Sequence, residues 1–167
     1  MSRAFVKEDA QGPDEDPPEK PVSDQPNYVT PRGLKILQDS EEDLLADLKG
    51  FEGAQEDPEK KKLKRELERD LRYVRARLEG AIPVDPANQP KDQVRFGATV
   101  VLRREDGTEK RVRIVGEDES ESDREATLSW AAPFAQVLFG LKAGQALDWE
   151  TDSGVEKWTV VSIDYAA

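Results

Sequence analysis

The side chains that could carry chemistry in this chain are carboxylates, lysines and tyrosines, because its 167 residues include no histidine and no cysteine. The absence of histidine removes the commonest general base, the commonest metal ligand and every Ser–His or Cys–His nucleophile pair. The absence of cysteine removes disulfides and thiol chemistry, as is usual in the cytoplasm. The sequence therefore argues against a self-contained enzyme, and we expect no catalytic site, cofactor or metal of its own.

Composition narrows the function classes further. Charged residues make up 37% of the chain, hydrophobic residues make up 36%, and the net charge is −11. This charge argues against broad, nonspecific affinity for nucleic acid or anionic membranes. No apolar run approaches the ~20 residues that a membrane span needs, and the N-terminus is too polar for a secretory signal. We expect a cytoplasmic protein of one or two small domains with no membrane partner.

Two helical arms are the first elements along the chain that could position the carboxylates and lysines. Apolar residues recur at helical spacing on both sides of a turn rich in glycine and proline at residues 50–58. They are Leu34, Leu37, Leu44, Leu45 and Leu48 in the first arm and Leu63, Leu67, Leu71, Val74 and Leu78 in the second. Because each arm is apolar along one narrow stripe, each needs a partner. We predict an antiparallel coiled-coil hairpin over residues 28–82.

Opposite charges on the two arms support this pairing. Residues 34–57 contain eight acids and two bases, whereas residues 58–79 contain nine bases and five acids. The flanks should attract each other, although each exposed pair contributes little. The turn between the arms carries Glu52, Glu56 and Asp57. From the residues alone, a solvated hairpin without chemistry is the default interpretation.

The segments around the hairpin have the composition of a tail and a linker. Residues 1–27 are rich in proline and acids and show no periodicity, so we predict that they are disordered. Thr30 followed by Pro31 predicts a helix start, with an N-cap hydroxyl and a proline at the first helical position. Gly80 suits the residue after the second helix. Three prolines in residues 83–93 predict a semi-rigid linker.

Residues 94–167 have a β pattern that predicts a compact α+β domain. The Asp106-Gly107 pair is a strong hairpin signal. The expected elements are strands at 94–103, 110–115, 125–130, 147–150 and 157–165, an acidic loop at 116–124 and one short helix at 131–141. We predict an antiparallel sheet of four or five strands with the helix across one face. Its core should take Trp130, Phe134, Leu138, Phe139, Trp149 and Trp158.

Several motifs, in this order and spacing, resemble the GreA/GreB transcription elongation factors. In the hairpin they are YVTPRGL at residues 28–34 and LRYVRARL at residues 71–78. In the β domain they are VRFGATV at 94–100, RIVG at 113–116, APFA at 132–135, GLKAG at 140–144 and SIDY at 162–165. The resemblance covers everything from residue 28 to residue 165, and we identify the chain as a divergent member with a shortened coiled coil and an acidic tail.

The resemblance implies an accessory factor of bacterial RNA polymerase. It implies an FKBP-like C-terminal domain that docks at the rim of the polymerase secondary channel, and a coiled coil that reaches toward the polymerase active site. Acidic residues at the family's tip help to hold a second Mg²⁺, so that the polymerase cleaves its own backtracked transcript. In this chain the tip acids would be Glu52, Glu56 and Asp57, with Mg²⁺ belonging to the polymerase. Nascent RNA would lie near the tip, and we expect a monomer.

The chain departs from the family in three places. The Gly-Asp-x-x-Glu-Asn tip motif is absent, and the hairpin is about two heptads shorter than in the longer members, which would shorten its reach by ~10 Å. The family's Ser-Pro is Ala132-Pro133 here, and the following arginine is Gln136. The candidates for polymerase docking are Ala131, Ala132, Pro133, Phe134 and Gln136. A strand-to-helix turn without direct contact is the competing interpretation.

Three other functions stay open at this point. The chain could be a non-cleaving secondary-channel regulator, similar to the short-coil Rnk proteins, that competes with cleavage factors. The β domain could be a peptidyl-prolyl isomerase, but that activity needs an open apolar pocket, and we expect the core to use up the aromatic residues. The basic face of residues 60–77 could bind nucleic acid directly, although such a face beside an acidic arm usually pairs within the molecule.

Overall fold

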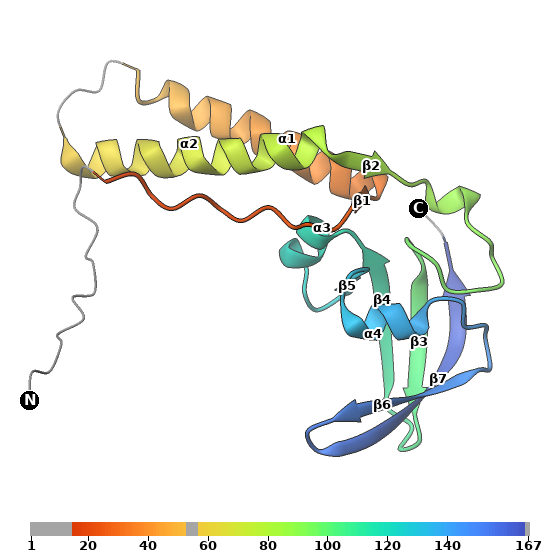
Figure 1. Cartoon of the computed structure of the whole chain (residues 1–167). Helices are drawn as coiled ribbons and strands as arrows, with labels where there is room; N and C mark the ends of the chain where they lie inside the picture. The colour runs from red at the N-terminus through yellow and green to blue at the C-terminus, as the bar shows by residue number, and fades with distance from the viewer. Residues whose placement is uncertain (1–14, 53–56, 166–167) are drawn as a thin grey trace, which may run out of the picture. The chain divides into compact units, whose positions relative to one another are not determined.

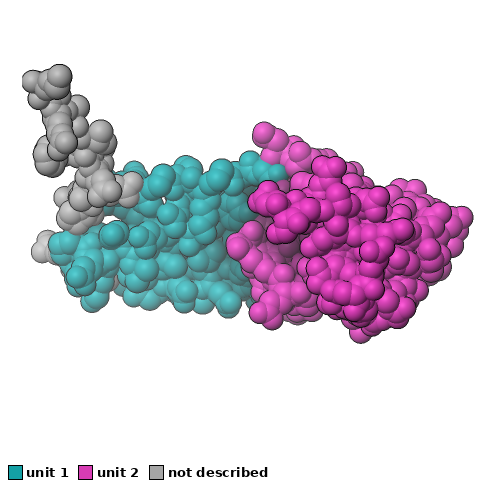
Figure 2. Space-filling model, turned by 90° about the horizontal axis from the view of Figure 1, so that it is seen from below, with its two compact units in different colours: residues 1–23, 38–79 teal, residues 24–37, 80–167 magenta. Residues whose placement is uncertain are grey.

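The computed structural model describes residues 15–52 and 57–165 of the chain, which forms two compact units. Unit 1 takes residues 1–23 and 38–79, and unit 2 takes residues 24–37 and 80–167. Figure 2 shows the two units in different colours. The boundary lies within the first long helix, because the first turns of that helix pack with the β domain. In the described residues no helix is long and apolar enough to cross a membrane.

Two long helices form where the leucine spacing predicts them: α1 (Pro31–Lys49) and α2 (Pro58–Glu79) (Figure 1). At the start of α2, the Glu59 amide donates to Asp57 Oδ1 at 3.0 Å, so Asp57 acts as the N-cap residue ahead of a proline. The α2 sequence is almost entirely Leu, Lys, Arg and Glu, which are good helix formers. An ion pair between Glu41 and Arg75 at 3.4 Å links α1 to α2 within unit 1.

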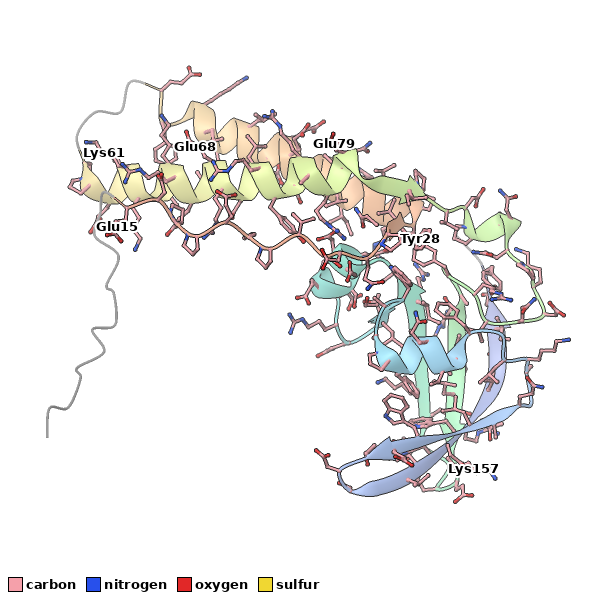
Figure 3. All side chains as sticks on the ribbon, viewed as in Figure 1. Glu15, Tyr28, Lys61, Glu68, Glu79 and Lys157 are labelled. Atoms are coloured by element: carbon pink, nitrogen blue, oxygen red, sulfur yellow. The ribbon has the colours of Figure 1, made fainter. Side chains whose placement is uncertain are left out.

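An extended N-terminal segment, residues 15–23, pairs with α2 in unit 1. Asp16 pairs with Arg65 at 3.5 Å, and Lys20 pairs with Asp70 at 3.0 Å. Glu19 accepts two hydrogen bonds from the Arg72 guanidinium, which lower the pKa of Glu19. In Figure 3 this segment runs from Glu15 along the helix that carries Lys61 and Glu68.

The sequence predicts disorder for residues 1–27, whereas the structure describes residues 15–27 with these partners. The difference has a physical reason: acids that repel one another in an isolated tail gain opposite charges along α2. Residues 1–14 lie outside the described residues.

Two short parallel strands in unit 2 come just before α1 and just after α2. They are β1 (Asn27–Val29) and β2 (Ala81–Pro83), and Tyr28 is level with Ile82 in the pairing. Gly116 lies so close to β1 that a Cβ added there would be 2.5 Å from the Tyr28 carbonyl oxygen. The backbone of the β domain therefore contacts β1 directly. A 3₁₀ turn, η1 (Pro86–Asn88), follows β2, and Asp85 caps it by accepting from the Ala87 amide at 2.9 Å.

The main sheet of unit 2 has five strands in the order β5-β4-β3-β7-β6. Their bounds are β3 (Thr99–Arg104), β4 (Glu109–Val115), β5 (Thr127–Ser129), β6 (Ala146–Thr151) and β7 (Gly154–Asp164). The antiparallel prediction holds for β4, β3, β7 and β6. It is wrong for β5, which pairs parallel with β4. The reason is the crossover between them, which brings the chain back to the end from which β4 starts.

That crossover contains α3 (Glu117–Ser122), where the sequence predicts an acidic loop. The expectation of one short helix is therefore wrong for the described part of unit 2. Three acids lie in the first turn of α3, the position at which negative charge stabilises a helix. The Ser120 amide donates to the Gly116 carbonyl at 3.0 Å and closes that turn.

The second short helix of unit 2, α4 (Pro133–Leu138), crosses one face of the sheet (Figure 1). Ala135 and Leu138 of α4 are fully buried in the hydrophobic core. The sheet contributes Val100, Leu102, Val112, Ile114, Trp158 and Val160 to the same core. These residues are two apart along each strand, so one face of the sheet is apolar and the other is free to carry polar residues.

The close approach at Gly116 gives a stability prediction. Replacing Gly116 with alanine puts a methyl group against the Tyr28 carbonyl oxygen, and we expect a loss of about 1–3 kcal/mol in the free energy of unfolding. Urea unfolding followed by tryptophan fluorescence measures it in unit 2, because Trp130, Trp149 and Trp158 all lie there. Ser153→Ala in the exposed β6–β7 turn is the control. If Gly116→Ala and Ser153→Ala have equal free energies of unfolding, the close packing of Gly116 against the Tyr28 carbonyl is contradicted.

Candidate functional site

The predicted docking segment forms a tight turn between β5 and α4. Ala132 is the N-cap residue of α4 and Pro133 is its first residue, with no side-chain capping hydrogen bond. The Ala132 amide donates to the Ser129 carbonyl at 3.0 Å, which closes the turn. The Gln136 side chain donates from Nε2 to the Trp130 carbonyl at 2.7 Å. Gln136 therefore fixes the turn from the first turn of the helix that follows it.

The five docking candidates differ in accessibility. Pro133 and Gln136 are exposed, whereas Ala131, Ala132 and Phe134 are half-buried. The Phe134 ring packs edge-on against Trp149, with 5.1 Å between ring centroids, and lies 6.2 Å from Trp158. Phe134 thus serves the packing of the sheet, which leaves Pro133 and Gln136 as the accessible members of the set.

Beside this turn lies a cavity of about 350 Å³, called here the aromatic pocket. Tyr28, Phe96, Trp130 and Phe139 form its apolar walls, and Val84, Gln89, Arg95 and Gln136 complete the lining. The Tyr28 ring is edge-on to Trp130 at 5.0 Å and is 6.0 Å from Phe96. These contacts set the shape of the pocket, because aromatic pairs prefer such tilted arrangements.

Trp130, which forms one wall of the aromatic pocket, also carries an unpaired hydrogen-bond donor. Its Nε1 is buried and has no hydrogen-bond partner in the described residues. A buried donor without an acceptor costs about 1–3 kcal/mol. The accessible walls of the pocket are mostly aromatic, so the pocket is suited to an apolar side chain of a ligand.

Polar residues at the edge of the aromatic pocket are fixed by local hydrogen bonds. Gln89 donates from Nε2 to the Phe96 carbonyl at 3.2 Å. The Arg95 amide donates to the Tyr165 hydroxyl at 2.7 Å, and that hydroxyl donates to the Gln93 carbonyl at 2.5 Å. Burial raises the pKa of Tyr165, an effect that the Arg95 amide partly offsets. The last strand is thereby tied to the chain that enters the pocket.

The six residues predicted for the core lie in it or pack against it, so that prediction is confirmed. Trp149 and Trp158 pack in or against the core, but Trp130 and Phe139 also line a cavity. Tyr28 and Phe96 come from segments far apart in the sequence, and no local spacing brings them together. They meet because β1, which pairs with β2, packs against the β domain at Gly116. The ground for setting aside an isomerase, the lack of an open apolar pocket, does not hold.

The predicted tip acids differ in their surroundings. Glu52 is exposed just after α1. Asp57 is engaged as the N-cap residue of α2 through the Glu59 amide. Glu56 lies outside the described residues. Within residues 15–52 and 57–165, no three acids are grouped so as to hold a metal ion.

Comparisons with known proteins place this architecture among relatives. Residues 89–165 match the family model "Transcription elongation factor, GreA/GreB, C-term". The transcription elongation factor GreB of Neisseria meningitidis serogroup B is 33% identical over 154 residues, which covers 83% of this chain and 94% of that protein. GreB of Pseudomonas aeruginosa is 38% identical over 110 residues, covering 63% of this chain and 62% of that protein.

A solved structure is also similar. The prokaryotic transcription elongation factor GreA/GreB from Nitrosomonas europaea is 23% identical, with a TM-score of 0.42, and the match covers 83% of this chain and 99% of that chain.

The alignment with the Neisseria protein also measures a difference in length. It extends over 154 positions, but 83% of the 167 residues of this chain is about 139 residues. About 15 aligned positions therefore have no residue of this chain opposite them.

The Tyr165 hydroxyl gives a pH prediction. Its pKa is raised in the folded state, so its contribution to stability is complete below the unfolded pKa of about 10 and is lost as the pH rises through the folded value. We expect the wild-type protein to be more stable than Tyr165→Phe by about 1 kcal/mol near pH 8. This difference should shrink above pH ~10. Urea unfolding across this range measures it, and a constant difference would contradict the assignment.

Proposed function

Since the chain belongs to the GreA/GreB family of transcription elongation factors, we propose that it binds bacterial RNA polymerase at the secondary channel and helps to rescue backtracked complexes by stimulating the polymerase's own transcript cleavage. The protein acts as an accessory factor, and the Mg²⁺ ions of the reaction belong to the polymerase. It works as a monomer in the cytoplasm, where the polymerase is. Nascent RNA lies near the turn between α1 and α2.

The observation that carries the docking half of this proposal is the aromatic pocket. It lies at the turn that resembles the family's docking segment, and its lining residues other than Tyr28 and Val84 fall within the residues that the family model matches. Its apolar walls suit a polymerase segment that inserts an apolar side chain. Exposed Pro133 and Gln136 would contact the same segment from the edge.

The proposal includes the finer architecture expected from the family. We take α1 and α2 to be an antiparallel coiled coil and the sheet of unit 2 to be FKBP-like. Opposite net charges on the two arms and the Glu41–Arg75 ion pair support the pairing. The crossing of α4 over a curled sheet is consistent with an FKBP-like unit 2. The coiled coil would be the part that enters the channel.

The same observations favour a second candidate, a channel regulator that does not stimulate cleavage. About 15 aligned positions of the Neisseria protein have no counterpart here. If one heptad is missing from each arm, the tip falls short by about 10 Å. Metal coordination tolerates distance errors of only about 0.2 Å. Moreover, Asp57 already accepts a backbone hydrogen bond. Binding without cleavage would then compete with true cleavage factors.

Direct binding of nucleic acid by the basic face of α2 receives less support. Arg65 and Arg72 of that face pair with Asp16 and Glu19 of the N-terminal segment. Arg75 pairs with Glu41 of α1. A polyanion would have to displace these carboxylates, so nearby RNA would be held mainly by the polymerase.

Replacing Trp130 tests the docking proposal. Trp130→Phe removes the unpaired N–H, so we expect unchanged or slightly higher stability, and it shrinks one aromatic wall of the pocket, so we expect about tenfold weaker binding to core RNA polymerase. Competition against a fluorescently labelled GreB measures the affinity. Trp149→Phe, which alters a tryptophan outside the aromatic pocket, should bind as the wild type does. Equal affinities for all three proteins would refute docking through this pocket.

The tip acids decide between the two candidates. We expect the wild-type protein to shorten transcripts in stalled, backtracked complexes, and Glu52→Gln, Glu56→Gln and Asp57→Asn each to slow that cleavage at least tenfold. Asparagine caps helices as well as aspartate does, so Asp57→Asn removes charge without weakening α2. Gel analysis of labelled RNA measures the rate. If saturating wild-type protein binds the polymerase without shortening the transcript, the non-cleaving regulator is correct.

A further inference from the structure

Three arginines of unit 2 converge on one hollow, called here the arginine pocket. Arg111 and Arg113 are two residues apart on β4 and so lie on the same face of the sheet. Arg32 comes from the first turn of α1. Together with Thr99, Asp123 and Thr127 they line a cavity of about 230 Å³. Arg32 and Arg111 are exposed and Arg113 is half-buried, so the guanidinium groups are accessible from solvent.

The charges in the arginine pocket are only partly balanced, because its lining has three arginines and one carboxylate. The chain carries a net charge of −11, and other arginines of the sheet pair with acids, as Arg103 does with Glu109 and Arg104 with Glu156. Within residues 15–52 and 57–165, none of the three pocket arginines forms an ion pair. Their mutual repulsion raises the free energy of the folded state unless an anion enters the cavity.

The remaining polar groups of the pocket are arranged for an oxyanion. Arg113 Nε donates to Thr99 Oγ1 at 3.4 Å, which orients both side chains and leaves the Thr99 proton available for an acceptor. The single carboxylate of the lining, Asp123, accepts from the Ala126 amide at 3.3 Å. The Thr127 hydroxyl donates to the Asp123 carbonyl and so holds the loop that forms this wall.

We propose that the arginine pocket binds a phosphate group. Three guanidiniums and one carboxylate give the pocket lining a charge of +2. A phosphate monoester carries about −1.5 to −2 at neutral pH and would balance this charge. A carboxylate ligand would balance only half of it. Planar guanidinium forks match phosphate oxygens in pairs, and a hydroxyl adds a further donor. The cavity is large enough for a diphosphate or for one nucleotide of a strand.

This site is separate from the aromatic pocket. The two share no lining residue. Arg111 and Arg113 alternate along β4 with the core residues Val112 and Ile114, so they face away from the side of the sheet that α4 covers. A phosphate bound there would not compete with a peptide segment at the aromatic pocket. The phosphate group comes either from a small diphosphate or from the backbone of single-stranded RNA.

Titration of the full-length protein with inorganic pyrophosphate and, in a second arm, with a single-stranded RNA 12-mer tests the proposal by isothermal calorimetry at low salt. We expect saturable binding of at least one probe, with Arg111→Gln and Arg113→Gln each weakening it at least tenfold. Arg103→Gln is the matched control, because it removes the same charge from a neighbouring strand outside the pocket. Circular dichroism checks that each variant is folded.

The outcomes distinguish the two sources of the phosphate from each other and from failure of the proposal. Pocket-dependent binding of pyrophosphate alone assigns the site to small diphosphates, and pocket-dependent binding of RNA alone assigns it to a strand backbone. Equal weakening by Arg103→Gln would mean a general charge effect and would overturn the proposal. If neither probe binds saturably at millimolar concentration, the proposal is also overturned. Polymerase binding is not needed for either arm, so failure here leaves the proposed function untouched.

Discussion

One buried hydrogen bond holds the start of the first long helix to the β domain. Thr30 Oγ1 donates to Glu119 Oε2 at 2.6 Å and accepts from the Gly33 amide at 2.9 Å, so a single hydroxyl caps α1 and ties it to α3. Glu119 is only 4% exposed. Gly33 leaves room for the carboxylate, since a Cβ there would be 3.0 Å from Glu119 Oε2. Charge-assisted bonds of this kind are roughly twice as strong as neutral ones.

Both candidate sites of unit 2 depend on this anchor. Tyr28, two residues before Thr30, forms a wall of the aromatic pocket, and Arg32, two residues after it, lines the arginine pocket. The Gly116 backbone contacts the Tyr28 carbonyl from the other side. A short stretch of chain thus supplies one lining residue to each site. In unit 1, α2 buries Leu71 and Val74, and acids of the N-terminal segment and of α1 pair with its arginines at the surface.

Local patterns in the sequence predict the local structure well and the sites poorly. Leucine spacing gives both long helices, Thr30-Pro31 gives the start of α1, and alternation gives most strands. The parallel pairing of β5 and the aromatic pocket were missed, because they depend on residues that meet only after folding. Thr30 and Glu119 are 89 positions apart, and nothing near either residue indicates the other. The resemblance to a family drew attention to the turn between β5 and α4, but not to the cavity beside it.

Site-specific photo-crosslinking tests the central claim, that the aromatic pocket is the surface by which this factor binds RNA polymerase. The photoreactive amino acid benzoylphenylalanine would replace Gln89 at the edge of the pocket and, in a control protein, Val155 at the β6–β7 turn. After irradiation with core polymerase, the account predicts a crosslink to the polymerase from position 89 and none from position 155. Crosslinking from position 155 but not from position 89 would contradict it.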